Sequence, residues 1–228
     1  MRIPTLPRSR PERVVLAGRY ARLEPLDPDR HGAALHAATF AGDAEARLRY
    51  VPAVPAEPVA YRGWLEALAA SEDPLHVAVI DLASGRCEGR QALMRIVPEH
   101  GVIEVGHVLW GPAIARTRVA TEALALCAGY AFDALGYRRL EWKCDARNAA
   151  SRHAAARFGF TYEGTFRQHM VTQGRNRDTA WFALLDHEWP SRRAALGAWL
   201  DPANFDADGR QRVALARGAP PPTDGPAR

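Results

Sequence analysis

Lysine, cysteine and long apolar segments are all scarce in this chain of 228 residues. No apolar run approaches the roughly 20 residues that a membrane-spanning helix needs, so we expect no membrane association. The first residues mix proline with arginine and lack the continuous apolar stretch of a secretory signal. The cysteines number three, and their wide spacing does not suit a metal site. These absences predict a cytoplasmic protein without a metal, in which Cys87, Cys127 and Cys144 are small buried hydrophobic residues.

Positive charge is carried almost entirely by arginine, because Lys143 is the only lysine. The formal net charge is +4 and the isoelectric point is about 9.2. Such a balance favours an anionic cofactor or a nucleic acid, but it also fits a simple compositional bias toward arginine and alanine. No nucleic-acid-binding motif accompanies the arginines, so we expect no specific nucleic-acid partner.

The chain divides into segments of different composition. Residues 1–12 and 217–228 lack apolar periodicity, which predicts a flexible N-terminal tail and a disordered C-terminal tail. Between them, residues 13–190 are expected to form one folded domain without internal repeats. Residues 191–216 are expected to add a helical extension.

Periodicity in the first half of the chain predicts helices packed on a meander of strands. Strands are expected at 20–26, 76–81, 90–97 and 102–110, and helices at 28–40 and 60–70. Ser84-Gly85 and His100-Gly101 supply tight turns, which favour antiparallel pairing. The proline-rich segment 51–59 is expected to be a loop.

Helices and strands alternate in the second half. The pattern predicts helices at 119–135, 149–158 and 191–200, and strands at 138–144, 160–169 and 179–186. The fold class is therefore mixed α/β, with a central, mostly antiparallel mixed sheet and helices on both faces.

One junction is suited to an anionic ligand. The strand that ends at Trp110 meets a Gly-Pro break, a short loop and then a long helix, whose first turn offers unpaired N–H groups and a positive dipole end. Arg116 and Arg118 add positive charge, and Thr117 and Thr121 add hydroxyl donors. Many such junctions bind nothing, so the alternative is a plain connection.

Three segments in order resemble one family. IEVGHVLWGPAIARTRVATEA (103–123), LGYRRLEWKCDARNAASRHAAARFGFTYEGTFRQ (135–168) and GRNRDTAWFALLDHEWP (174–190) resemble motifs of the GNAT N-acetyltransferases. The likeness is nearest to the branch with ribosomal-protein alanine and serine N-acetyltransferases, and it covers about residues 13–190. It implies a GNAT-type fold and an acyltransferase that uses acetyl-CoA as co-substrate.

The resemblance also implies which residues contact acetyl-CoA. They are Val108, Leu109, Arg116, Thr117, Arg118, Val119, Ala120, Thr121, Asn148 and Ser151. The family's diphosphate loop reads Q/R-x-x-G-x-G/A, whereas this chain has Ala115 at the first position and Arg118 at the first glycine position. We expect Arg118 to pair with a phosphate, and Arg116 to make the polar contact that the methyl group of Ala115 cannot make.

Direct transfer of acetyl to an amine is the mechanism that the family implies. A backbone N–H near His107–Leu109 is expected to stabilise the developing oxyanion. Glu104 and His107 are candidate bases, and Ser151 is a candidate proton donor to the thiolate. The alternatives are a strand carboxylate paired with an arginine, a structural histidine, and an Asn148 that serves only as a helix cap. Strand alternation puts Glu104 on the face opposite His107.

The acceptor is expected to be a primary amine, with a protein N-terminal α-amine as the first candidate. A small-molecule amine, such as an antibiotic, a polyamine or an amino-acid-like compound, is the alternative within the same class. Because the diphosphate loop is altered, a further alternative is a catalytically idle acyl-CoA-binding module. A monomer and a homodimer are both compatible with the sequence.

Overall fold

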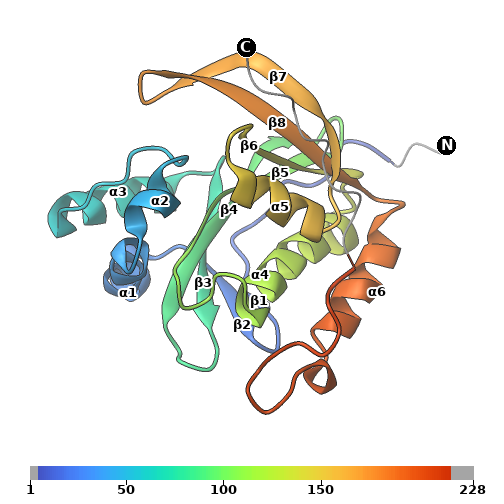
Figure 1. Cartoon of the computed structure of the whole chain (residues 1–228). Helices are drawn as coiled ribbons and strands as arrows, with labels where there is room; N and C mark the ends of the chain where they lie inside the picture. Colours follow the sequence, from blue (N-terminus) through green and yellow to red (C-terminus); the bar gives the residue numbers. More distant parts are fainter. Residues whose placement is uncertain (1–4, 217–228) are drawn as a thin grey trace. The chain divides into compact units, whose positions relative to one another are not determined.

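The computed structural model describes residues 5–216, which form two compact units (Figure 1). The first unit extends to Leu140 and the second begins at Glu141, inside strand β6 (Arg139–Asp145). The sequence predicted one domain over residues 13–190, so the division into units is an addition to that prediction. The predicted disorder of residues 217–228 lies outside the described residues.

The first unit contains an antiparallel sheet in the order β1-β2-β3-β4-β5. Its strands are β1 (Leu16–Ala17), β2 (Ala21–Pro25), β3 (Leu75–Asp81), β4 (Cys87–Val97) and β5 (Val102–Trp110). The predicted meander is confirmed, and the bounds of β5 match the prediction. The short edge strand β1 was not predicted, because two residues carry no readable alternation.

Helices cover both faces of this sheet. They are α1 (Pro28–Phe40), α2 (Ala44–Leu48), α3 (Pro58–Ala70) and α4 (Arg118–Gly129), and α4 continues as a π-helical turn (Tyr130–Ala134). Leu35 of α1 and Leu65 of α3 pack on Ala78 and Ile80 of β3. On the opposite face, the Gln91 side chain of β4 donates to the Ala123 carbonyl of α4 at 2.9 Å. The mixed α/β class with a mostly antiparallel sheet is confirmed.

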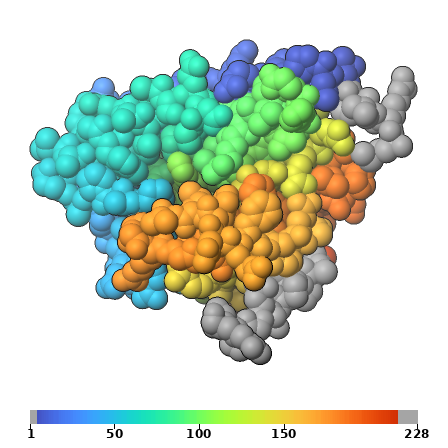
Figure 2. Space-filling model, turned by 90° about the horizontal axis from the view of Figure 1, so that it is seen from above, coloured from blue at the N-terminus to red at the C-terminus, as the bar shows by residue number. Residues whose placement is uncertain are grey.

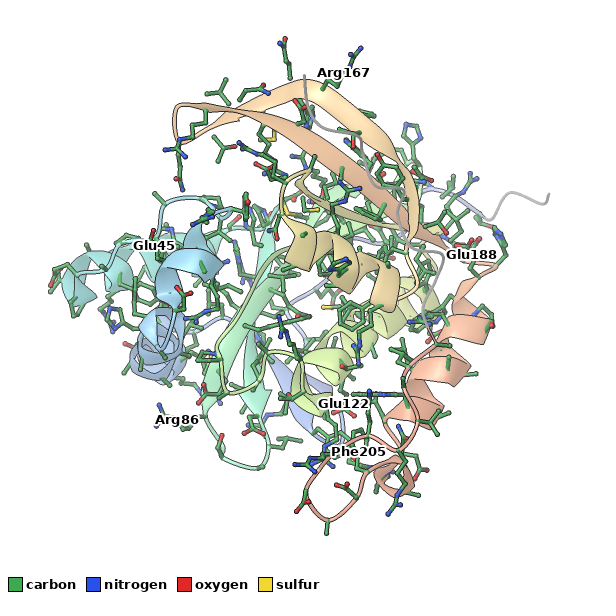
Figure 3. The ribbon with its side chains drawn as sticks, viewed as in Figure 1. Glu45, Arg86, Glu122, Arg167, Glu188 and Phe205 are labelled. Carbon is green, nitrogen blue, oxygen red and sulfur yellow. The ribbon has the colours of Figure 1, made fainter. Side chains whose placement is uncertain are left out.

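Glu122 of α4 fastens this helix to the edge of the sheet (Figure 3). Its carboxylate accepts the backbone N–H groups of Arg19, Tyr20 and Ala21 at 2.9, 2.6 and 2.7 Å. A Cβ at Gly18 would lie 2.4 Å from this carboxylate, so the close approach requires glycine there. The hydrogen bonds of this buried carboxylate therefore stabilise the turn before β2.

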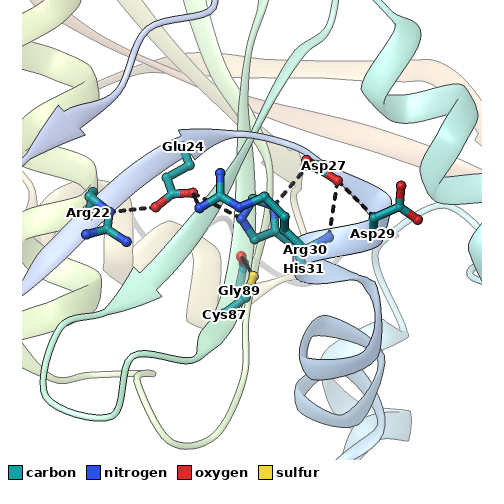
Figure 4. A network of polar contacts seen from close by, with 8 residues as sticks. All are labelled: Arg22, Glu24, Asp27, Asp29, Arg30, His31, Cys87 and Gly89. Carbon is teal, nitrogen blue, oxygen red and sulfur yellow. Dashed lines mark hydrogen bonds and ion pairs between the residues drawn. The ribbon is translucent and has the colours of Figure 1, made fainter.

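A second buried carboxylate, Glu24 of β2, joins the sheet to α1 (Figure 4). It forms ion pairs with Arg22 at 2.6 Å and Arg30 at 2.7 Å, and the His31 ring lies 3.2 Å from it. The Asp27 N–H donates to His31 Nδ1 at 3.1 Å, so Nε2 carries the proton that faces Glu24. The start of α1 is therefore set by this network and by the Asp27 cap.

Residues 5–12, predicted as part of a flexible tail, are attached to the first unit. The Arg8 N–H donates to the Pro98 carbonyl at 3.0 Å, and the Glu12 N–H donates to the Tyr130 hydroxyl at 2.9 Å. The prediction missed these bonds because they join positions far apart in the sequence.

The second unit pairs its strands in the order β6-β8-β7 and adds two α-helices. The elements are α5 (Ala149–Arg157), β7 (Thr161–Thr172), β8 (Arg175–Leu185) and α6 (Trp189–Trp199). Strands β7 and β8 form a long hairpin closed at Gly174, which has a φ of +71°. The hairpin lies at the surface seen in Figure 2. Val171, near its end, is 76 % exposed.

The predicted helical extension at 191–216 is helical only in its first part. Helix α6 begins two residues earlier, at Trp189, and a 3-10 turn (Pro202–Asn204) follows it. The Arg192 side chain of α6 donates to the carbonyls of Arg157 and Phe158, so it holds the end of α5.

Candidate active site

Strand β5 carries a β-bulge at His107. Ala92 of β4 pairs with Gly106, and Arg90 pairs with Leu109. One residue of β4 therefore lies opposite two residues of β5 between these pairs. His107 has a φ of +48°, a left-handed conformation that is uncommon for a residue with a side chain. A bulge removes a peptide from the ladder, and such features gather beside active sites. The predicted oxyanion segment, His107, Val108 and Leu109, therefore contains the irregular peptide.

Because of the bulge, the predicted orientation of His107 is wrong. Simple alternation put His107 opposite Glu104, but its ring stacks on His76 with centroids 5.3 Å apart. His76 pairs with Ala92 and Ala92 with Gly106, so the three share a face of the sheet. The inserted residue and the positive φ turn the ring to the face of Glu104 and Gly106.

Burial keeps both stacked rings neutral. It lowers the pKa of His107 to about 4, and the charges of Arg90 and Arg95 add to this effect. It lowers the pKa of His76 to about 3, and neither ring nitrogen of His76 has a hydrogen-bond partner among the described residues. A base with a pKa near 4 holds a proton weakly at neutral pH, which disfavours His107 as the proton acceptor.

Arg90 of β4 was not singled out from the sequence, although it contacts the bulge. Its side chain is 3 % exposed, and its Nη1 donates to the His107 carbonyl at 3.0 Å. The guanidinium also lies 4.9 Å from the centroid of the Trp64 ring on α3. Burial lowers the pKa of Arg90 to about 10, and Tyr61 acts in the opposite direction. An arginine at the start of a predicted buried strand is the sequence signal that could have identified it.

Glu104 lies on the same face and is 5 % exposed. Arg95 Nε is 3.1 Å from Glu104 Oε2, so the pairing with an arginine, one of the two alternatives, is present. Arg95 occupies a second bulge, on β4, where the Arg95 and Ile96 N–H groups donate to the Asp73 carboxylate at 2.8 and 3.0 Å. The ion pair does not remove Glu104 as a candidate base, because a carboxylate must be ionised to accept a proton.

The predicted diphosphate site lies at the start of α4 in the first unit. Thr117 is the N-cap of the helix, Arg118 is its first residue, and Val119 and Ala120 continue its first turn. Arg116 is exposed just before the cap, and Arg118 lies 4.8 Å over the Tyr20 ring. The positive end of the helix thus lies at a chain segment that contains two arginines, which suits a diphosphate.

The threonines of this loop do not offer the hydroxyl donors that the sequence predicted. Thr117 Oγ1 donates to the Ile114 carbonyl at 2.7 Å, and Thr121 Oγ1 donates to the Thr117 carbonyl at 2.9 Å. A hydroxyl has one proton, so both are already used in shaping the loop and the helix start. The left-handed residue of the loop is Arg116, with a φ of +65°, and Arg118 does not require a glycine conformation.

Asn148 and Ser151 meet at the start of α5 in the second unit. Asn148 is the N-cap, and its Oδ1 accepts the Ser151 N–H at 3.1 Å. The cap role is confirmed, and the contact with acetyl-CoA remains a prediction. Trp142 Nε1 donates to Ser151 Oγ at 2.9 Å. This bond occupies a lone pair, and the Cys144 side chain is a second hydrogen-bond partner of the hydroxyl. The role of Ser151 as a proton donor remains a prediction.

Asp145, the first residue of the D-x-x-N motif, organises the turn before α5. Its carboxylate accepts the Arg147 N–H at 2.9 Å and the Arg147 Nη2 at 2.8 Å. Burial alone would raise the pKa of Asp145, but the bonds from Arg147 outweigh it and lower the pKa. The sequence motif by itself did not predict this role.

The cysteines are unsuited to nucleophilic catalysis. Cys87, Cys127 and Cys144 are buried and unpaired, as predicted. Burial raises their pKa values to about 12, 12 and 11, which disfavours the reactive thiolate. Within residues 5–216, no group of three or more metal-binding side chains occurs and no helix is long and apolar enough to cross a membrane.

A protein-family model described as an acetyltransferase (GNAT) domain matches residues 21–161, more than half of the chain. No curated protein matches the chain significantly.

Solved structures of similar proteins carry related descriptions. A GCN5-related N-acetyltransferase from Brucella melitensis is 54% identical, with a TM-score of 0.91, and the match covers 92% of this chain and 96% of that one. A protein from Chromobacterium violaceum described as a probable GNAT acetyltransferase is 42% identical, with a TM-score of 0.75, over 83% and 97% of the two chains. RimJ of Mycobacterium smegmatis, solved in complex with CoA-disulfide, is 20% identical, with a TM-score of 0.66, over 78% and 89%, and shows the fold alone.

Proposed function

This chain belongs to the GNAT family of acetyltransferases, and from that premise we propose that it transfers acetyl from acetyl-CoA directly to a primary amine, first of all a protein N-terminal α-amine. The observation that carries the proposal is the bulge at His107. It takes one peptide of β5 out of the sheet ladder at the segment where the family resemblance expects an oxyanion donor.

The start of α4 fits the diphosphate of acetyl-CoA. Arg116 and Arg118 supply charge, and the first helical turn supplies amide donors. Thr117 acts by capping the helix rather than by donating its hydroxyl to the ligand. When bound, acetyl-CoA supplies a thioester whose acyl carbon accepts a nucleophile.

The remaining chemistry concerns protons. Glu104 is the preferred proton acceptor, because it is a buried carboxylate on the face of the bulge and a negative charge attracts a protonated amine. The neutral His107 ring has no such attraction. An α-amine with a pKa near 8 is partly neutral at pH 7, whereas a lysine amine near 10.4 is almost wholly protonated. A modest base therefore suffices for an N-terminal amine. Ser151 is the proposed proton donor to the leaving thiolate.

The proposal is tested by titrating the purified protein with acetyl-CoA and by following thiol release with candidate amines. Peptides and small-molecule amines are compared, and intact mass identifies the acetylated product. We expect micromolar binding and acetylation of a peptide α-amine. Modification of metabolites alone would replace the protein acceptor with a small molecule. Binding without thiol release on any amine would indicate an idle acyl-CoA-binding module.

Glu104→Gln tests the assigned base. Turnover is expected to fall about 100-fold, most severely below the pKa of the amine, because general-base assistance matters most when the amine is protonated. Rates are measured from about pH 6 to 9 beside wild type. Equal rates across that range would remove Glu104 from the mechanism.

A further inference from the structure

The backbone carbonyl of His107, at the bulge of β5, accepts a hydrogen bond from a buried cation. Arg90 Nη1 donates to this carbonyl at 3.0 Å. Because Arg90 pairs with Leu109 across the two strands, its side chain rises beside the bulge on the face covered by α1 and α3. The guanidinium is held there by the Trp64 ring on α3, 4.9 Å from its carbon.

The carbonyl of His107 and the N–H of Val108 belong to one peptide group. Among the described residues, cis peptides occur only at Leu6-Pro7 and Asp73-Pro74, so this peptide is trans and its two polar groups point in opposite directions. The carbonyl points toward the Arg90 side chain, so the Val108 N–H points away from that side chain. Arg90 thus fixes the direction of this donor.

A hydrogen bond from a cation also polarises the peptide that accepts it. Charge-assisted bonds are stronger than neutral ones, and chains of hydrogen bonds strengthen one another in a low-dielectric interior. Arg90 is buried, and its Nε has no hydrogen-bond partner among the described residues. The hydrogen bond to the His107 carbonyl is therefore one of the main interactions that stabilise its positive charge. Withdrawal of electrons at the carbonyl makes the Val108 N–H a better donor.

We propose that Arg90 is a positioning residue that orients and polarises the His107–Val108 peptide, so that the Val108 N–H stabilises negative charge on the acyl oxygen. This inference rests on the proposed acetyl transfer, and it assigns a role within that reaction to a side chain that touches neither substrate. The strained φ of His107 is maintained because the carbonyl has this partner and the ring stacks on His76.

The test compares Arg90→Gln and Arg90→Lys with Arg86→Gln, a control that removes an exposed arginine just before β4. For Arg90→Gln we expect kcat to fall roughly 10- to 100-fold, the effect of a slightly misplaced catalytic group, while the Kd of acetyl-CoA changes less than about threefold. Arg90→Lys keeps the charge and is expected to recover part of kcat. A folded Arg90→Gln protein with wild-type kcat, or with kcat unchanged and only KM raised, would overturn the proposal.

A second readout needs no turnover. The ¹⁵N chemical shift of the Val108 amide, observed in protein labelled at valine, reports hydrogen bonding at the carbonyl of the same peptide. We expect it to move in Arg90→Lys and to stay in place in Arg86→Gln. An unmoved signal would overturn the positioning role even if Arg90→Gln fails to fold. If wild type acetylates no amine, the proposed function fails, whereas this shift still decides whether Arg90 controls the peptide.

Discussion

The two faces of the sheet in the first unit both bury charge, but they use it differently. On the α4 side, the Glu122 carboxylate accepts three backbone N–H groups within 2.9 Å. On the α1 and α3 side, Arg90 has one unpartnered nitrogen, and His76 has two, among the described residues. Buried polar groups are normally satisfied, and exceptions gather where a structure serves a reaction. The satisfied face holds the fold together, and the under-satisfied face is the one that carries the bulge.

The largest expected effect is a loss of stability when the hydrogen bonds of the satisfied face are disrupted. Glu122→Gln removes the charge from three hydrogen bonds and sets an amide N–H₂ against backbone donors, so the free energy of unfolding should fall by about 3 kcal/mol. Urea denaturation measures it, with the exposed Glu99→Gln as a control expected to stay within about 0.5 kcal/mol of wild type. A loss below about 1 kcal/mol for Glu122→Gln would mean that the carboxylate is not structurally important.

The second effect is a loss of stability at acid pH that originates on the under-satisfied face, at His76. Burial lowers the pKa of His76 to about 3 in the folded protein, against about 6.5 when unfolded. The unfolded chain therefore binds the proton first, and stability falls as the pH drops below about 6.5. At pH 5 this group alone should remove about 2 kcal/mol.

His76→Phe keeps an aromatic ring against His107 but cannot bind a proton. Its stability should change less than that of wild type between about pH 7 and pH 5, as measured by denaturation at each pH. The exposed His187→Gln serves as the control and should retain the wild-type acid sensitivity. Parallel curves for His76→Phe and wild type would show that His76 does not carry the acid sensitivity.

The smallest effect concerns backbone strain on the under-satisfied face. His107→Ala and His107→Asn both lose the stacked ring, but asparagine tolerates the left-handed region and alanine does not. The alanine variant should be about 1 kcal/mol less stable than the asparagine variant. Chemical denaturation of the pair compares them directly. Equal stabilities would indicate that the bulge relaxes once the ring is removed.

The regular elements on both faces were predictable from local signals. The bounds of α1 and β5 followed from local signals, a cap with proline for the helix and a turn with alternation for the strand. Helix α4 was predicted, although its last part is a π-helical turn rather than the expected α-helix. Helix α2 was missed, because its five residues lie in a loop and depend on the Asp43 cap.

The candidate site was predictable in its parts but not in its contacts. The loop before α4 and the Asn148 cap were recognised from motifs. The bulge has no local signature, because a histidine in a left-handed conformation is held there by Arg90 and His76, which lie on other strands. The direction of the Thr117 and Thr121 hydroxyls likewise depends on backbone carbonyls that only the folded loop presents.

The bulge is also an insertion that the sheet register absorbs. β5 contains one residue more than β4 across the same stretch of ladder, so removal of that residue would restore regular pairing between the two strands. Leu109 and Trp110 would keep Arg90 and Gly89 as their partners on β4, and only the irregular peptide between Gly106 and Leu109 would be lost. A single inserted residue therefore changes the direction of one peptide in β5 without changing the register of the residues that lead into α4.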